Sequence, residues 1–168
     1  MWSSKLIALC SVVLLAALTV LGGCGFQLRG SYELPYKTLL VTSTSTSIVA
    51  GQIRRELADT NTKIVGAVKD AEATLTVIEE RRDRQILSLS RAGRAVEYEL
   101  RLYVSYQFVD KSGMVIIPTS ALELKRILAY KDNQVIASQQ EEAMLYQDME
   151  RDASGQILRR MIAIKRPQ

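Results

Sequence analysis

Residues 96–108 read VEYELRLYVSYQF, and this stretch decides the fold of the chain. Apolar side chains occupy every second position from Val96 to Phe108, and charged or polar side chains fill most of the positions between them. Successive side chains of a β-strand point to opposite faces of a sheet, so a period of two predicts a long strand with one buried face and one hydrated face.

Turn signals flank this strand, with RAGR at residues 91–94 and DKSG at residues 110–113. Further strands are predicted before the first turn and after the second, so that the middle of the chain forms an antiparallel meander. Pro118 lacks a backbone N–H, which predicts an edge, a bulge or a lead-in at the start of the later strand. The flanking strands are expected at Ala73–Ile78, with a recovery at Ile86–Leu89 after the polar residues 79–85, and at Met114–Tyr130.

Two amphipathic helices are predicted, one before and one after the meander. Val49, Ile53 and Leu57 recur every four residues behind the Ser/Thr-rich run 43–47, which supplies N-cap candidates, and this helix is expected to stop near Asn61. From about residue 139 onward, apolar residues again step by three or four positions. The second stripe consists of Ala143, Tyr146, Met149, Ala153, Ile157, Met161 and Ile164.

These elements predict an α+β fold. A β-branched segment, Thr38–Thr42, adds a first strand. Two helices with one apolar stripe each, and a sheet with one apolar face, bury those surfaces against each other. We therefore expect a two-layer sandwich, in which a four-stranded, mainly antiparallel sheet carries both helices on one face. The opposite face of the sheet is expected to be polar and exposed.

The N-terminus predicts a lipoprotein signal peptide over residues 1–23. Lys5 precedes an uncharged apolar run, Leu6–Leu21, that is shorter than the roughly 20 residues of a membrane-spanning helix. The run ends in LGGC, so Cys24 is expected to carry N-acyl and S-diacylglycerol lipid. The alternatives are an ordinary signal peptide or a short membrane anchor with an accidental cysteine. Residues 24–168 are then expected to form a single domain, with residues 24–37 as a lipidated arm.

Composition argues against most enzyme classes. The 168 residues include no histidine, which removes Ser–His and Cys–His pairs and most zinc sites. No phosphate loop, nucleophile elbow or metal-ligand spacing is present, and Glu79 and Glu80 are expected on opposite faces of a strand. A net charge of +4 is too mild for a dedicated nucleic-acid binder. The chain is therefore predicted to be no enzyme and to hold no metal and no cofactor other than its lipid.

A basic cluster surrounds the first turn of the meander. Guanidinium groups suit phosphate oxygens, and a hairpin would gather these side chains at one end of the sheet. The alternative is a solvated hairpin tip. Aromatic side chains are not interleaved with the arginines, which disfavours RNA and leaves a phosphorylated lipid head group as the candidate ligand. The cluster consists of Arg81, Arg82, Arg84, Arg91 and Arg94.

Several motifs, taken in order, resemble the LPS-assembly lipoprotein family (LptE, also called RlpB). They are CGFQLRG at residues 24–30, GRA at 93–95 leading into EYEL at 97–100, the Pro118 segment, and a terminal helix with Met144, Met149, Ala153 and QILRR at 156–160. The resemblance covers nearly the whole chain after residue 23. It implies two helices on one face of a four-stranded sheet, and a plug and assembly factor inside the outer-membrane β-barrel LptD, in a one-to-one complex. Such a subunit helps to deliver lipopolysaccharide to the outer leaflet.

The resemblance also suggests roles for particular residues. The basic residue that the family offers to lipopolysaccharide falls on Arg91, whereas a lysine of some relatives falls on Ser138. The segment with Pro118, Thr119, Ser120 and Leu124 corresponds to family surface that faces the barrel wall, although an edge strand alone also explains it. A stand-alone periplasmic carrier of an amphipathic lipid, with an apolar cavity between sheet and helices, is the alternative function. A lipid-anchored hydrolase is a distant third.

Overall fold

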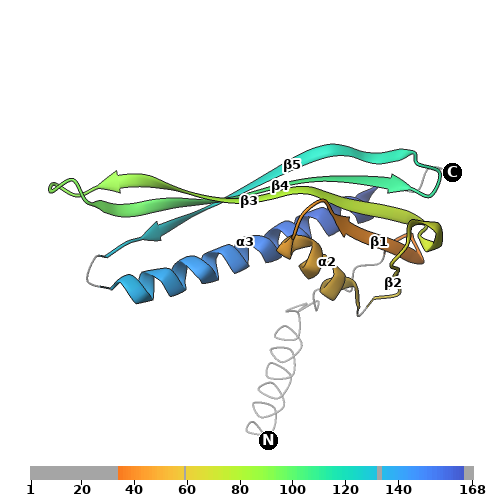
Figure 1. The fold of residues 1–168 in the computed structure, drawn as a ribbon, viewed down its shortest axis with the longest axis horizontal. Helices are drawn as coiled ribbons and strands as arrows, with labels where there is room; N and C mark the ends of the chain where they lie inside the picture. Colours follow the sequence, from red (N-terminus) through yellow and green to blue (C-terminus); the bar gives the residue numbers. More distant parts are fainter. Residues whose placement is uncertain (1–33, 59, 132–133, 165–168) are drawn as a thin grey trace, which may run out of the picture. The chain divides into compact units, whose positions relative to one another are not determined.

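The computed structural model describes residues 34–58, 60–131 and 134–164. Five strands form one sheet, and two α-helices lie along one side of it (Figure 1). The elements are β1 (Thr38–Ser43), α2 (Ile48–Ala58), β2 (Lys63–Ile64), a short 3₁₀ helix (Val68–Asp70), β3 (Ala73–Leu89), β4 (Ala95–Asp110), β5 (Val115–Ala129) and α3 (Val135–Ala163). The predictions for residues 1–33, including Cys24, lie outside the described residues.

The sheet has the order β2-β1-β3-β4-β5. Strands β3, β4 and β5 are long and antiparallel, which confirms the predicted meander. The prediction of four strands is wrong, because the two-residue strand β2 adds a fifth, and the sheet is mixed because β1 runs parallel to both β2 and β3. Strand β2 is held by backbone hydrogen bonds from Lys63 N to Lys37 O (2.8 Å) and from Val65 N to Leu39 O (3.0 Å).

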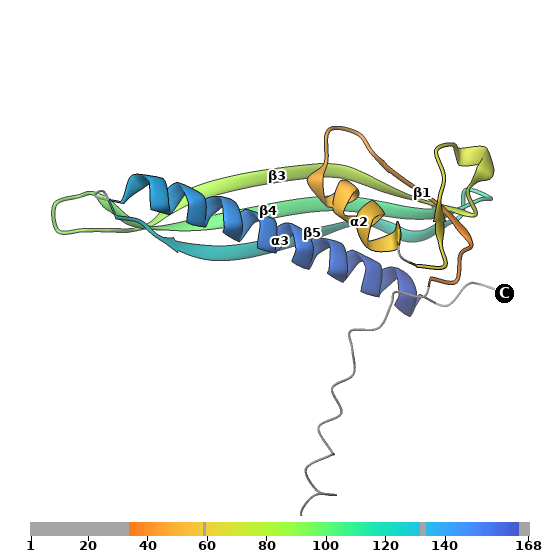
Figure 2. The ribbon, with the colours of Figure 1, turned by 90° about the horizontal axis from the view of Figure 1, so that it is seen from below.

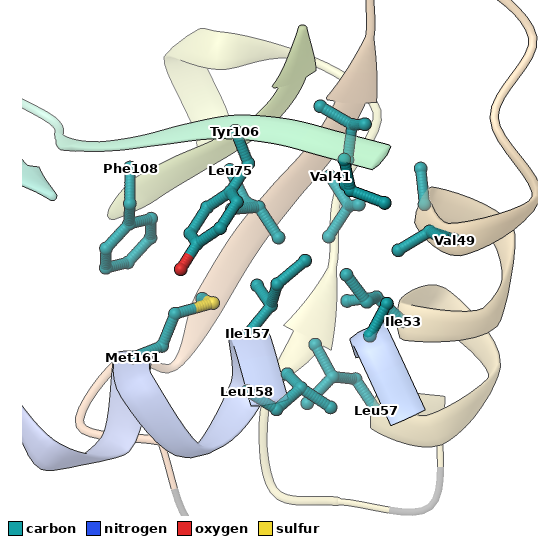
Figure 3. Packing of buried hydrophobic residues seen from close by; sticks show 14 of the residues in the cluster. Val41, Val49, Ile53, Leu57, Leu75, Tyr106, Phe108, Ile157, Leu158 and Met161 are labelled. Atoms are coloured by element: carbon teal, nitrogen blue, oxygen red, sulfur yellow. The ribbon is translucent and has the colours of Figure 1, made fainter. Parts of the chain in front are cut away.

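Strand β4 carries the core of the protein, as its period of two predicts. Its even-numbered residues from Leu100 to Phe108 are buried and face the helices. Figure 3 shows Phe108 and Tyr106 above Met161 and Ile157 of α3, with Leu75 of β3 beside them. The turns at either end contain Gly93 (φ +74°) and Gly113 (φ +84°), a left-handed conformation that favours glycine.

Strand β3 continues through the polar stretch that the sequence suggests as an interruption. A register shift between Val77 and Glu79 makes a bulge, and it changes which side chains face the helices. Odd-numbered residues such as Leu75 face the core before the bulge, whereas Arg82 lies opposite Leu102 and faces the helices after it.

Helix α2 is capped from a distant strand. The Glu80 carboxylate of β3 accepts hydrogen bonds from Ser47 Oγ (2.5 Å) and Val49 N (3.0 Å), and Ser47 Oγ accepts one from Ala50 N (2.9 Å). The N-cap predicted within residues 43–47 is thereby confirmed at Ser47. Glu79 points the other way and lies 3.6 Å from Arg81, so the two adjacent carboxylates do face opposite sides.

Replacing Glu80 by alanine is expected to lower the free energy of unfolding by about 1–2 kcal/mol, since an N-cap and a partly buried charged hydrogen bond are lost together. Urea unfolding followed by circular dichroism measures the change. The matched control is Glu79→Ala, which removes only an exposed ion pair and should cost at most about 0.5 kcal/mol. Equal losses in the two variants would show that Glu80 does not hold the helix.

Helix α3 begins at Val135, four residues earlier than predicted, and crosses the sheet obliquely (Figure 2). Its buried stripe includes Tyr146, Met149, Ala153, Ile157 and Met161, as predicted, and it meets α2 at Ser154, whose hydroxyl donates to Glu56 (2.6 Å). The first turns are different, because Ile136 is 73% exposed. Ser138 of these turns is buried, but the apolar side chains that α3 contributes to the core cluster begin only at Leu145 and Tyr146.

The face of the sheet that points away from the helices, here called the outer face, is mostly polar, as predicted. Arg101 of β4 pairs with Glu99 and lies 4.0 Å from Glu123 of β5, which in turn lies 3.5 Å from Lys125. The guanidinium of Arg81 lies over the ring of Tyr103. This face is suited to water or to a polar surface of another molecule.

Candidate functional site

The five arginines around the β3–β4 hairpin do not form one cluster. Arg81 lies on the outer face, beside Glu79. Arg82 and Arg84 point to the helix side, where carboxylates of α3 neutralise them. Arg91 and Arg94 lie at the turn and are exposed. The hairpin itself is confirmed, but it divides the basic residues among two faces and a tip.

Arg82 joins β3 to the middle of α3. Its Nε donates to the carboxylate of Glu150 at 3.0 Å, a second bond runs from its terminal nitrogen to the same oxygen, and the guanidinium lies 4.9 Å from the ring centre of Tyr146. Glu150 is only 3% exposed, so this carboxylate depends on Arg82 for its counter-charge. Arg82 is therefore a structural residue and is not available to a ligand.

Arg84 is held in a similar way, closer to the turn. It donates to Glu142 of α3 at 2.9 Å and lies 4.5 Å from the ring centre of Tyr98. The hydrogen bond to Glu142 raises the pKa of Arg84 above its usual value. Because Glu142 is more exposed than Glu150, a competing anion can replace it more readily.

An open groove of about 570 Å³ lies between β3 and α3 beside these two arginines. The Tyr146 hydroxyl donates to the backbone carbonyl of Asp83 at 2.7 Å across it. Burial, with a contribution from Glu142, raises the pKa of Tyr146, so this hydroxyl remains protonated and keeps its role as donor. The groove residues are Arg82, Asp83, Arg84, Gln139, Glu142, Ala143 and Tyr146.

The hairpin tip combines exposed cations with exposed apolar side chains. The turn is closed by hydrogen bonds between Ser90 and Arg94, whose backbone groups lie 2.7 Å apart at Ser90 N and Arg94 O. Arg91 forms no ion pair with any residue that the structure describes. Ile86 and Leu89, next to the turn, are each 58% exposed. A tip of this composition suits a ligand that carries both anionic and apolar groups.

The partner-interface candidates lie on β5, which is an edge strand, as Pro118 predicted. Register shifts place a bulge at Pro118 and Thr119, both of which are exposed. The Ser120 hydroxyl donates to the carbonyl of Pro118 at 2.8 Å, and Leu124 is half-buried on the helix side. The four residues therefore share one strand edge, although they do not share one face.

Ser138, the position on which the family resemblance places a lysine of some relatives, is buried in the first turns of α3. A side chain at this position points into the protein, so it adds nothing to the exposed cations of the hairpin tip. The carboxylates Glu142 and Glu150, with Tyr146 between them, were missed as partners of the arginines. Their spacing of four residues on one side of α3 is the signal that could have found them.

The described part of the chain contains no group of three or more Cys, Asp or Glu residues placed to hold a metal ion. Over the same residues, neither helix is long and apolar enough to cross a membrane.

Comparison with known proteins identifies the family. Residues 36–161 match the family model LptE, described as "Lipopolysaccharide-assembly". The LPS-assembly lipoprotein LptE of Yersinia pestis (strain Pestoides F) is 31% identical over 154 residues, which cover 88% of this chain and 72% of that protein. The solution structure of an uncharacterized lipoprotein B from Nitrosomonas europaea has a TM-score of 0.72 at 35% identity, covering 83% of this chain and 91% of the other.

A crystal structure of rare lipoprotein B from Shewanella oneidensis gives a TM-score of 0.64 at 26% identity, with coverage of 74% and 92% respectively. The family match extends from β1 into the end of α3, the elements that form the core and the hairpin tip. The chain belongs to the LptE family of lipopolysaccharide-assembly proteins.

Proposed function

We propose that this chain is a non-catalytic subunit of the outer-membrane lipopolysaccharide assembly apparatus. In this proposal it occupies the lumen of the β-barrel LptD in a one-to-one complex, as plug and assembly factor, and binds lipopolysaccharide. A lipid on Cys24 anchors it to the outer membrane. Membership of the LptE family supports a role in lipopolysaccharide assembly. The polar outer face supports a position inside a water-filled barrel lumen.

The hairpin tip is the observation that carries the lipopolysaccharide part of the proposal. Arg91 and Arg94 are exposed there, next to Ile86 and Leu89, whereas Arg82 and Arg84 are engaged by α3. Lipopolysaccharide presents phosphates beside acyl chains, so exposed guanidinium groups next to exposed apolar side chains match both parts of it. The groove between β3 and α3 lies on the helix side of β3, beside Arg82 and Arg84.

For the barrel contact, we propose the β5 edge at Pro118, Thr119, Ser120 and Leu124. The bulge and the exposed proline make this part of the strand irregular, which suits contact with a specific partner surface better than continued sheet pairing. A stand-alone lipid carrier is less well supported, because the side chains of β4, α2 and α3 fill the space between sheet and helices (Figure 3).

Reversing both charges of the tip, Arg91→Glu with Arg94→Glu, is expected to weaken lipopolysaccharide binding by about tenfold or more, since each charged hydrogen bond contributes about 1.5–3 kcal/mol. Binding of purified lipopolysaccharide to the purified chain measures this, and circular dichroism checks that the fold is unchanged.

The matched control reverses two other exposed cations, Lys111→Glu with Arg159→Glu, away from the tip. Lys111 lies in the opposite turn of the meander and Arg159 near the end of α3, so the net charge changes equally at a distance from the tip. If both double variants bind as the unsubstituted chain does, Arg91 and Arg94 are solvated turn residues and the tip is not the binding site.

A further inference from the structure

Strand β5 leaves a long edge of the sheet open. Of the two edge strands, β2 has only two residues, whereas β5 has 15 and pairs with β4 alone. The N–H and C=O groups along such an edge are a template for pairing with another strand, and proteins usually shorten or interrupt edges of this length. In the part of the chain that the structure describes, no element pairs with the outer side of β5.

The regular part of this edge is limited to one half of the strand. From Ser120 to Ala129, the register with β4 runs without a shift. Before Ser120 the strand is bulged, and Pro118 lacks a backbone N–H. An added strand can therefore pair continuously only with residues 120–129, whose middle lies next to Leu124.

The outer-face side chains of this segment are self-complementary about Leu124. In an antiparallel pair of two such strands centred on Leu124, Glu123 lies opposite Lys125 of the second copy, and Lys125 opposite its Glu123. On the same outer face, Ala121 lies opposite the large side chain of Ile127. Directly opposite residues of antiparallel strands interact most strongly, and opposite charges are favourable there.

We propose that β5 pairs antiparallel with β5 of a second copy of this chain, centred on Leu124. Glu123 and Lys125 are accessible to a second copy, because their side chains are 46% and 49% exposed. The new pairs would replace the exposed contacts of Glu123 with Lys125 (3.5 Å) and with Arg101 (4.0 Å). The pairing buries Ile127, which is 61% exposed, against Ala121 of the second copy. It also joins the two sheets into one continuous sheet.

If the proposed function holds, the dimer and the complex with the barrel use overlapping parts of β5. The proposed barrel contact includes Ser120 and Leu124, which the self-paired strand would occupy. The two states therefore exclude each other. The dimer covers the open edge of chains that are not bound to LptD, which keeps that edge from pairing with other strands. The experiments below use the chain without LptD or lipopolysaccharide, so their failure leaves the proposed function standing.

The first test measures self-association of the full chain by analytical ultracentrifugation, after extraction in a mild detergent and purification away from LptD and lipopolysaccharide. The unsubstituted chain is expected to form dimers. Glu123→Lys places two Lys–Lys pairs in the dimer and is expected to raise its dissociation constant about tenfold. The double variant Glu123→Lys with Lys125→Glu restores opposite charges at both positions, so it should dimerise again. The matched control Glu79→Lys, on the outer face but on β3, should leave the dimer unchanged.

The second test fixes the register by oxidative cross-linking of the purified full chain in a mild detergent, free of LptD and lipopolysaccharide. Leu124→Cys is expected to cross-link to itself, because directly opposite Cα atoms lie about 4.5–5.5 Å apart, within the range of a disulfide. Ala121→Cys alone and Ile127→Cys alone should not cross-link, because the two copies of either residue lie about 20 Å apart in the dimer. A mixture of the two variants should cross-link, because Ala121 of one copy lies opposite Ile127 of the other. The unsubstituted chain, prepared in the same way, gives the background from any native cysteine that remains as a thiol.

Three results would overturn the proposal. The first is that the unsubstituted chain remains monomeric at every concentration. The second is that the charge-swapped double variant does not restore a dimer that Glu123→Lys weakens. The third is that Ala121→Cys cross-links to itself as readily as Leu124→Cys does. The last result would mean a contact with a different register or direction.

Discussion

Replacing Phe108 by alanine should lower the free energy of unfolding by about 3–5 kcal/mol, the largest stability effect that we expect from a single substitution in the core. The ring is fully buried, and Tyr36 meets it edge-on with 5.4 Å between ring centres. It lies opposite Leu75 of β3 and Ile117 of β5 in the sheet register. Its removal therefore leaves a cavity where three strands and α3 meet, which urea unfolding would detect.

The control for this substitution is Tyr103→Ala. Tyr103 is an aromatic residue of the same strand on the outer face, where it is half-buried beneath Arg81. Its loss should cost about 1 kcal/mol, because little area is buried and the cation–π contact is exposed. If Phe108→Ala were no more destabilising than Tyr103→Ala, the helix-facing side of β4 would not be the core.

Replacing Arg82 by alanine should cost about 3 kcal/mol, because it leaves the buried carboxylate of Glu150 without its counter-charge. Arg81→Ala is the matched control, since the same residue type on the opposite face of the same strand pairs only with exposed Glu79. We expect the control to change stability by no more than about 0.5 kcal/mol.

A rescue variant separates the buried charge from general damage to the strand. Arg82→Met with Glu150→Leu removes both charges and replaces them with apolar side chains of similar size, so the double variant should recover most of the lost stability. Urea unfolding of the three variants measures this. A double variant as unstable as Arg82→Ala would mean that packing by the arginine, and not its charge, holds β3 to α3.

The meander could be predicted because its strongest signal is local. Alternation from Val96 to Phe108 fixes the buried face of β4, and the glycines at positions 93 and 113 fix the turns that return the chain. The helices α2 and α3 follow from stripes of the same kind. These patterns depend only on which side of a strand or helix faces the core, so a single sequence is enough to predict the elements.

Two features of the sheet could not be read in this way. Strand β2 has two residues, too few to show any period, and only its backbone bonds to β1 define it. The polar middle of β3 lacks apolar alternation because its inward positions hold Arg82 and Arg84, whose partners lie about 60 residues away on α3. A strand stabilised by distant ion pairs gives no local hydrophobic signal.

The sequence predicts which basic residues lie near the β3–β4 turn, but it does not predict which way their side chains point. The sequence shows five arginines near one turn, but the bulge after Val77 decides which of them face the helices. Counted from Leu75 without that bulge, Arg81 and Asp83 would point inward. With the bulge, Arg82 and Arg84 do so, and only Arg91 and Arg94 remain at the tip. A single shift of register therefore decides which arginines of β3 reach the carboxylates of α3.

The most direct measurement is affinity capture of the tagged full chain from outer membranes, with quantification of every protein recovered in stoichiometric amount. If the chain plugs the lipopolysaccharide translocon, LptD should be recovered in a one-to-one ratio, and depletion of the chain should leave LptD immature. Recovery of the chain without any β-barrel protein, together with normal LptD maturation in its absence, would contradict the proposed function.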